Sequence, residues 1–218
     1  MQTELFINKC LQAIGRKTSL EGIFSLYSKI TRKTQIEDNK SKAYHVNIYR
    51  AQGGRIRIEK HDQEQKITTI LNGLAGIEKT EVLIEKPPIL IKTISLELQQ
   101  IMDIKRAVRL YPRNFLAHVN EHSYDFKGLQ LIDNVYVYVL DLLVEDVTYY
   151  FDPTTFFCLS LIDKRNNSKT YYSDYQKTDN IFTPLKEKTI LDDQTQIDYI
   201  THIKYNLKLA NDLFVTSY

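Results

Sequence analysis

Tryptophan is absent from the sequence, and cysteine, proline and glycine are scarce, with 2, 5 and 7 residues. The two cysteines, Cys10 and Cys158, are too few for a disulfide-built scaffold, and free buried thiols are favoured over one disulfide. Charges nearly cancel, at +2 net, and no basic block stands out, which argues against nucleic acid as a partner. No apolar run approaches the roughly 20 residues that a membrane-spanning helix needs.

The N-terminal segment, MQTELFINKC, lacks the basic and long apolar regions of a signal peptide. The sequence therefore fits either a cytoplasmic protein or an exported protein whose signal is missing from it.

Aromatic and β-branched residues are what the chain has in abundance, including 15 tyrosines and 9 phenylalanines. Such residues favour pleated, half-buried surfaces. A length of 218 residues fits one large all-β domain or two small ones.

Helical periodicity appears in two regions. Residues 3–15 carry apolar side chains at three-to-four spacing, with Gly15 placed to end the helix. A second helix is predicted after Ser95 as N-cap, in SLELQQIMDIKRAVRLYP, and a short one in RNFLAHVNEH. Residues 20–27 are either helical or extended, and residues 37–42 are expected to form an exposed loop.

Strand-like alternation fills most of the remaining chain. Residues 44–58 predict a hairpin around Gly53 and Gly54, followed by a strand at 67–71, the turn Asn72-Gly73 and a short strand at 76–78. After residue 124 the strands return, with turns at Asp133-Asn134, Asp152-Pro153, Asn166-Asn167 and Asp179-Asn180 and a last strand in TQIDYITHIKYNL. Short connections predict an antiparallel meander of about ten strands.

One strand is apolar on both faces. In VYVYVLDLLV, the side chains of Val135, Val137 and Val139 point one way, and those of Tyr136, Tyr138 and Leu140 point the other. Either both faces are covered, or one of them lines an apolar cavity. The helices predicted at 3–15 and 95–122 are the available cover.

Residues capable of chemistry are present but form no signature. His118 and His122 share a face of a helix, yet without a third ligand they are expected to be solvated rather than to bind zinc. Cys158 lies between apolar residues and is expected to be packed rather than nucleophilic. No Gly-x-Ser-x-Gly elbow occurs, and Asp141, Glu145 and Asp146 are expected to be a solvated strand end.

The order of these features resembles the outer-membrane lipoprotein-sorting proteins, the LolA/LolB-like superfamily. Asp152-Pro153-Thr154 matches a turn of that family, and Asp174-Tyr175 followed by Asn180 and Pro184 matches its last hairpin. The opening helix LFINKCLQAIGRK, the hairpin GGRIRIEKHDQEQKITTILNG and the ending NLKLANDLF are also similar, so the resemblance spans nearly the whole chain.

The resemblance implies one domain over residues 1–218 that is mainly β (α+β): an unclosed antiparallel half-barrel, with an N-terminal helix and a helical lid over its concave face. It implies a periplasmic, non-enzymatic carrier of lipid or acylated lipoprotein for transport to the outer membrane, without cofactor, metal or nucleic acid. Arg55 and Arg57 are the candidates for the arginine that locks the family's lid. The expected lipid-binding residues are Tyr44, Val46, Ile48, Ile56, Ile58, Ile101, Met102, Ile104, Val108, Val135, Val137, Val139, Tyr149 and Phe157.

Two alternatives remain open at this point. The same fold could serve as an interaction or sensor module that regulates a membrane-associated protein partner through an exposed strand edge and the loop near Glu37. A hydrolase of lipid-like esters is the weaker alternative, because the sequence shows no nucleophile signature.

Overall fold

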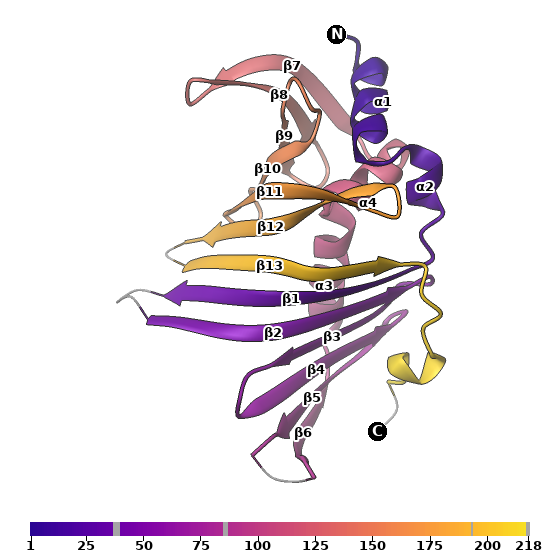
Figure 1. Ribbon diagram of the computed structural model, residues 1–218, viewed down its shortest axis with the longest axis vertical. Coiled ribbons are helices and arrows are strands. Elements are labelled where there is room, and N and C mark those ends of the chain that lie inside the picture. Colours follow the sequence, from indigo (N-terminus) through magenta and orange to yellow (C-terminus); the bar gives the residue numbers. More distant parts are fainter. Residues whose placement is uncertain (37–39, 85–86, 193, 217–218) are drawn as a thin grey trace. The chain divides into compact units, whose positions relative to one another are not determined.

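The computed structural model describes residues 1–36, 40–84, 87–192 and 194–216 (Figure 1). Its helices are α1 (Thr3–Ile14), α2 (Lys17–Glu21), α3 (Leu98–Leu110), α4 (Pro112–Ala117) and the 3-10 turns η1 (Val119–Glu121) and η2 (Asn211–Phe214). Its strands are β1 (Ser25–Ile36), β2 (Lys40–Ala51), β3 (Arg55–His61), β4 (Gln65–Asn72), β5 (Ala75–Val82), β6 (Ile89–Ser95), β7 (Tyr124–Ile132), β8 (Val135–Leu142), β9 (Val147–Phe151), β10 (Cys158–Asp163), β11 (Ser168–Thr178), β12 (Ile181–Leu191) and β13 (Gln194–Tyr205).

The described strands form one antiparallel sheet in the order β6-β5-β4-β3-β2-β1-β13-β12-β11-β10-β9-β8-β7. Every neighbour except the β1–β13 pair is also a neighbour in sequence, because short turns join consecutive antiparallel strands. With β6 and β7 at its two edges, the sheet is open, as a half-barrel requires. The mainly β, unclosed fold class expected from the sequence is confirmed.

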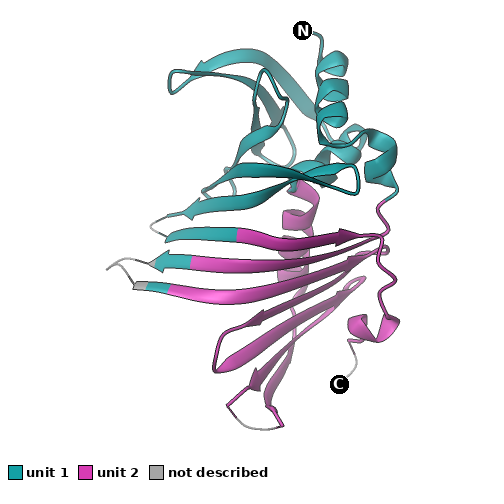
Figure 2. Cartoon of the chain, viewed as in Figure 1, with its two compact units in different colours: residues 1–22, 34–41, 111–198 teal, residues 23–33, 42–110, 199–218 magenta. Residues whose placement is uncertain are grey.

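Contacts divide the chain into two compact units (Figure 2). Unit 1 contains residues 1–22, 34–41 and 111–198, and unit 2 contains residues 23–33, 42–110 and 199–218. Each unit is assembled from three separate chain segments, so neither corresponds to a simple half of the sequence. The expectation of a single domain stays a prediction.

In unit 1, α1 forms where the apolar spacing predicted it. Its buried side chains are Phe6, Ile7, Cys10, Leu11 and Ile14. The helix ends at Gly15, whose φ of 135° is open to glycine but strained for other residues, and whose N–H donates to the Leu11 carbonyl. The region at 20–27 is both helical and extended, since α2 ends at Glu21 and β1 begins at Ser25.

The predicted turns are confirmed by their backbone conformations. Gly53 and Gly54 join β2 to β3, and both have positive φ, at 77° and 70°. Asp133 and Asn134 have φ of 49° and 63°, and Asp179 and Asn180 have φ of 50° and 65°. Asparagine and aspartate tolerate this left-handed region better than other residues with a Cβ, which is why these dipeptides reverse the chain here.

Three predictions about boundaries were wrong. Most of β1, and β6 directly after the Pro87-Pro88 pair, were not predicted, so the described residues form thirteen strands instead of about ten. Ser95 ends β6 rather than capping α3, which begins at Leu98. The predicted loop at 37–42 lies partly outside the described residues, and residues 40–42 belong to β2.

Candidate functional site

An apolar face of unit 2 lies under helix α3. In the β2–β3 register Ile48 pairs with Ile58, and in the β3–β4 register Ile56 pairs with Leu71. Paired residues of neighbouring strands project from the same face of the sheet, so these four side chains share one face. Val46, two residues before Ile48, projects from this face too and is 1% exposed.

Helix α3 covers this face with one side of its apolar stripe. Ile101, which is 1% exposed, forms a buried cluster with Ile56 and Leu71. The partly buried residues packed against the cluster are Ile58, Leu96, Ile104 and Val108. The positions 101, 104 and 108 follow the three-to-four spacing of one helix face, so a single stripe holds the helix on the sheet. We call these seven residues the α3 cluster.

A glycine allows this close approach. A Cβ at Gly76 would lie 2.8 Å from Leu71 Cδ2, 3.0 Å from Ile101 Cγ1 and 3.0 Å from Leu96 Cδ1. These distances are shorter than ordinary van der Waals contact, so a larger residue would displace at least one neighbour. Gly76, rather than a turn requirement, therefore sets how deeply α3 seats on β4 and β5.

A polar contact adds to the attachment of α3. The Lys105 ammonium donates a hydrogen bond to the Gly73 carbonyl in the β4–β5 turn. Met102, which the sequence placed on the lipid-facing side, is 49% exposed on α3, and Leu98 is 60% exposed. The side of α3 that packs on the sheet is therefore the Ile101, Ile104 and Val108 side.

The two candidate locking arginines lie on the other face of β3. Arg55 donates to Asn211 Oδ1 at 2.9 Å, and Arg57 donates to the Leu213 carbonyl at 3.2 Å, so both hold the C-terminal turn η2. Arg57 also donates from Nε and Nη2 to one oxygen of Glu59, Oε1, at 2.8 and 2.6 Å. Alternation along β3 places these residues opposite Ile56 and Ile58, and therefore away from α3.

The charge cluster on that face shifts the pKa of Glu59. Burial disfavours the charged form of Glu59, but hydrogen bonds and charges from Arg57 and Lys66 outweigh it and lower the pKa of its carboxyl. Lys66 Nζ lies 3.3 Å from Glu59 Oε1. A buried carboxylate between two cations is stabilising here because its charge is compensated.

In unit 1, α1 and α4 fill the aromatic face of the sheet. The Phe6 ring of α1 stacks on Phe126 at 4.4 Å and meets the Phe151 ring edge-on at 5.3 Å. Phe115 of α4 stacks on Tyr149 at 4.7 Å, and Tyr149 is fully buried. The helices at 3–15 and 112–117 thus cover one of the two apolar faces, the one that carries Tyr138 and Tyr149.

The predicted lipid-binding residues of unit 1 do not share one face. Leu140 pairs with Tyr149, whereas Val139 pairs with Tyr150, so Tyr149 and Val139 project from opposite faces. Val135 and Val137 alternate in step with Val139, away from the helices. Phe157 packs elsewhere, in an aromatic group stacked 4.3 Å from Tyr175. Val137 and Val139 are 5% and 7% exposed, whereas Val135 is 55% exposed, so both faces of β8 are covered only along its inner part.

The remaining candidates for chemistry are structural. His118 is exposed beside Glu121, while His122 is buried, with Nδ1 2.8 Å from Glu145 Oε1, so the two histidines do not converge. Among the described residues no group of three or more potential ligands could hold a metal. Cys10 and Cys158 are free and buried, and burial raises the pKa of both thiols, which opposes a nucleophilic role.

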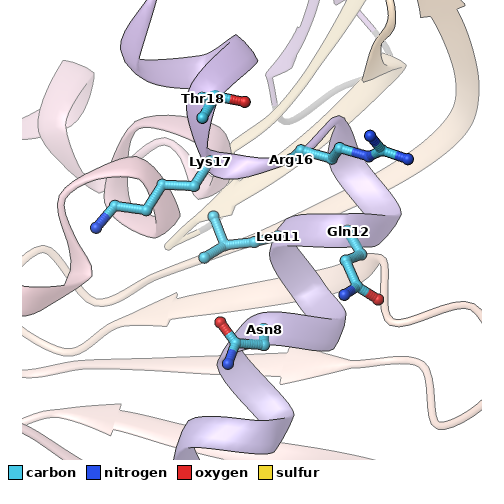
Figure 3. Close-up of a pocket in the computed structure, with 6 residues that line it drawn as sticks. All are labelled: Asn8, Leu11, Gln12, Arg16, Lys17 and Thr18. Carbon is cyan, nitrogen blue, oxygen red and sulfur yellow. The ribbon is translucent and has the colours of Figure 1, made fainter.

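Two pockets open at the end of α1, and neither is lined by a residue of the predicted lipid-binding set. One, of about 600 Å³, is lined by Asn8, Leu11, Gln12, Arg16, Lys17 and Thr18 (Figure 3). The second, of about 450 Å³, is lined by Gln12, Gly15, Arg16, Ser19, Lys177, Asn180 and Phe182. Both are lined mostly by polar and charged residues, and the sequence patterns gave no signal for them. No described helix is long and apolar enough to cross a bilayer.

Comparison with known proteins gives a match in structure alone. No family model matches the sequence, and neither does any curated protein. A LolA superfamily protein from Nitrosomonas europaea has a TM-score of 0.61 and 12% identity, covering 99% of this chain and 98% of that chain. A DUF1329 family protein from Desulfovibrio piger has a TM-score of 0.60 and 13% identity, covering 97% and 96%.

A third solved structure, a putative outer membrane lipoprotein-sorting protein domain from Vibrio parahaemolyticus, has a TM-score of 0.55 and 6% identity, covering 91% of this chain and 92% of that chain. The chain therefore has a LolA/LolB-like fold, as the resemblance implied. At these identities the likeness establishes the fold and leaves the activity to be argued from the site.

Proposed function

We propose that this protein is a non-enzymatic, periplasmic carrier that holds the acyl chains of a lipid or an acylated lipoprotein against the sheet face beneath α3. The observation that supports it best is the α3 cluster. There an amphipathic helix shields an apolar strand face by side-chain packing, in a fold shared with a lipoprotein-sorting protein domain. A surface of this kind buries apolar groups without forming directional hydrogen bonds to them, which suits an acyl chain.

In this proposal the described structure is the closed state. Ile101, Ile104 and Val108 occupy the face that the cargo would use, so α3 must move before an acyl chain can enter. Removing three such side chains from their contacts costs on the order of 5–9 kcal/mol, at about 1.5–3 kcal/mol each, as an upper bound. Burial of about ten CH₂ groups returns about 8 kcal/mol at ~0.8 kcal/mol each. The two terms are similar, which allows loading and release without an external energy source at this step.

The structure narrows the proposed contact residues. From the strands we retain Val46, Ile48, Ile56 and Ile58, with Tyr44 at the outer end of the same face. From the helix we retain Ile101, Ile104 and Val108. Val135, Val137 and Val139 face away from the helices of unit 1 and are not retained, and neither is Met102 on the outer side of α3.

Displacement of a fluorescent fatty acid tests the proposal. We expect saturable binding to the wild-type protein, at least a tenfold loss of affinity in Ile58→Glu, and unchanged affinity in Met102→Glu. The two variants add the same charge, one on the sheet face under α3 and the other on the exposed side of that helix. Circular dichroism and thermal unfolding establish that both variants fold. Absence of binding to the wild-type protein, or equal effects of the two substitutions, would reject the acyl-chain site.

A second function, an interaction module for a membrane-associated protein partner, is favoured by one observation at the sheet edge. Ile89, Leu90 and Ile91 of edge strand β6 are 47%, 54% and 60% exposed. An edge strand offers unpaired backbone groups to an extended segment of another protein. Replacing Leu90 with lysine would weaken capture of such a partner and leave fatty-acid binding intact, which separates the two functions.

A further inference from the structure

The pocket of about 450 Å³ in unit 1 has the composition of an anion site. Its lining contributes two cations, Arg16 and Lys177, together with the polar uncharged side chains of Gln12, Ser19 and Asn180. No aspartate or glutamate is among its lining residues. The lining therefore carries two positive charges, no negative one and several side chains that can donate hydrogen bonds, which favours a negatively charged ligand.

The walls of the pocket are fixed by a tight contact between α1 and the β11–β12 turn. A Cβ at Gly15 would lie 2.6 Å from the Asn180 carbonyl oxygen, so only glycine allows the end of α1 to rest on this turn. Asn180 and Asp179 are themselves held at positive φ by the hairpin. The helix end and the hairpin turn thus form one rigid corner, which holds Arg16 beside Lys177.

Arg16 adopts a backbone conformation that few residues with a Cβ adopt. Its φ is 67° and its ψ is 147°, in a region that is close to glycine-only. Figure 3 shows its side chain extending on the side of Gln12, whereas Lys17 extends in the opposite direction. Lys17 is paired with Glu21 at 3.6 Å. Within the described part of the chain, neither Arg16 nor Lys177 forms an ion pair.

From this geometry we propose that the pocket binds a phosphate monoester group. A phosphate monoester carries about −1.5 to −2 charges near neutral pH, which matches one arginine and one lysine. The planar guanidinium of Arg16 can donate two parallel hydrogen bonds to phosphate oxygens, and Lys177 adds a point charge. The volume falls at the small end of the range for ligand pockets, about 300–1,000 Å³. The inference does not rest on the acyl-chain proposal, since the pocket and the α3 cluster share no residue.

Two sources could supply this phosphate: a soluble phosphate ester, or the headgroup of a phospholipid. Calorimetric titration with glycerol 3-phosphate at low ionic strength tests the first source. Co-sedimentation with vesicles of phosphatidic acid, whose headgroup is a phosphate monoester, in phosphatidylcholine, against phosphatidylcholine alone, tests the second. Saturable binding in either assay supports a phosphate site and identifies its source.

Four variants decide whether the binding belongs to this pocket. We expect Arg16→Gln and Lys177→Gln each to lower affinity at least tenfold, because each removes one of the two charges. Lys188→Gln, which changes an exposed lysine on the adjacent strand β12, should leave affinity within about twofold. Arg16→Gly removes the side chain at a position whose positive φ glycine adopts without strain, so loss of binding in this variant cannot be attributed to misfolding. Absence of binding in both assays, or equal losses in the pocket variants and in Lys188→Gln, would overturn the proposal.

Discussion

Gly76→Ala is the sharpest test of how α3 is seated. The added methyl group would lie 2.8 Å from Leu71 Cδ2 and 3.0 Å from Ile101 Cγ1. Both are side-chain atoms, so the neighbours shift and the cost stays within the usual 1–3 kcal/mol of overpacking. The lower entropy of the unfolded chain returns about 0.4–1 kcal/mol. The net loss in the free energy of unfolding is about 0.5–2 kcal/mol, and it comes from the contact between α3 and the sheet.

The expected result is a change in the local opening of α3, which is measured separately from the global stability of the protein. If α3 is a lid, a loss of about 1.4 kcal/mol raises the open population about tenfold, and hydrogen exchange of α3 amides speeds up by the same factor. The affinity for a fluorescent fatty acid rises with it, because apparent affinity is limited by the fraction of molecules that are open. Exchange measured by mass spectrometry and a binding titration on the same sample report both quantities.

The control for Gly76→Ala lies on the opposite face of β4. Ile70 is 3% exposed and alternates with Leu71, so its side chain points away from α3. Ile70→Val therefore lowers the free energy of unfolding by about 0.5–1.5 kcal/mol through the same strand, without changing a contact of α3. We expect a lower melting temperature with unchanged fatty-acid affinity. If Gly76→Ala destabilises the protein but leaves α3 exchange and affinity unchanged, or if Ile70→Val reproduces its effects, α3 is a fixed part of the core and the lid model is refuted.

Three further predictions concern other parts of the molecule. Arg16→Gly should raise the free energy of unfolding by about 1 kcal/mol, seen in urea denaturation, because it relieves a strained φ of 67°; a loss of stability would contradict that reading. Glu59 has a lowered pKa when folded, so its contribution is complete above the unfolded pKa of about 4.3 and is lost as the pH falls below it. Melting temperatures of Glu59→Gln should therefore depend less on pH than those of wild type in this acid range, and parallel curves would exclude the effect. His122→Phe should cost about 1–3 kcal/mol in urea denaturation, because it removes the buried contact of 2.8 Å between His122 Nδ1 and Glu145 Oε1, and an unchanged free energy of unfolding would show that this contact is dispensable.

Local patterns predicted the parts of the fold that local chemistry determines. The end of α1 at Gly15 and the turn at Asp179-Asn180 were evident because few residues tolerate those backbone angles. Strand β1 was missed because its sequence, SLYSKITRKTQI, alternates weakly and carries several charges; it becomes a strand by pairing within the sheet. β6 was missed for a related reason, since ILIKTIS follows a proline pair and gains its order from β5.

The candidate site was only partly predictable, because some of its contacts are made between residues far apart in the sequence. The hairpin register follows from the glycine turn, so Ile48, Ile56 and Ile58 could be assigned to one face in advance. The side of α3 that contacts the sheet could not be predicted in the same way. Two stripes fit the helical spacing equally well: Leu98, Ile101, Met102 and Val108, or Ile101, Ile104 and Val108. The choice depends on Gly76, whose missing side chain admits Ile101, and on the Gly73 carbonyl that accepts from Lys105. Gly76 lies in β5 and Gly73 in the β4–β5 turn, 22 and 25 residues before α3 begins at Leu98, and no periodicity within α3 encodes them. The rotation of this helix, which decides what an acyl chain would meet, is thus determined by long-range packing.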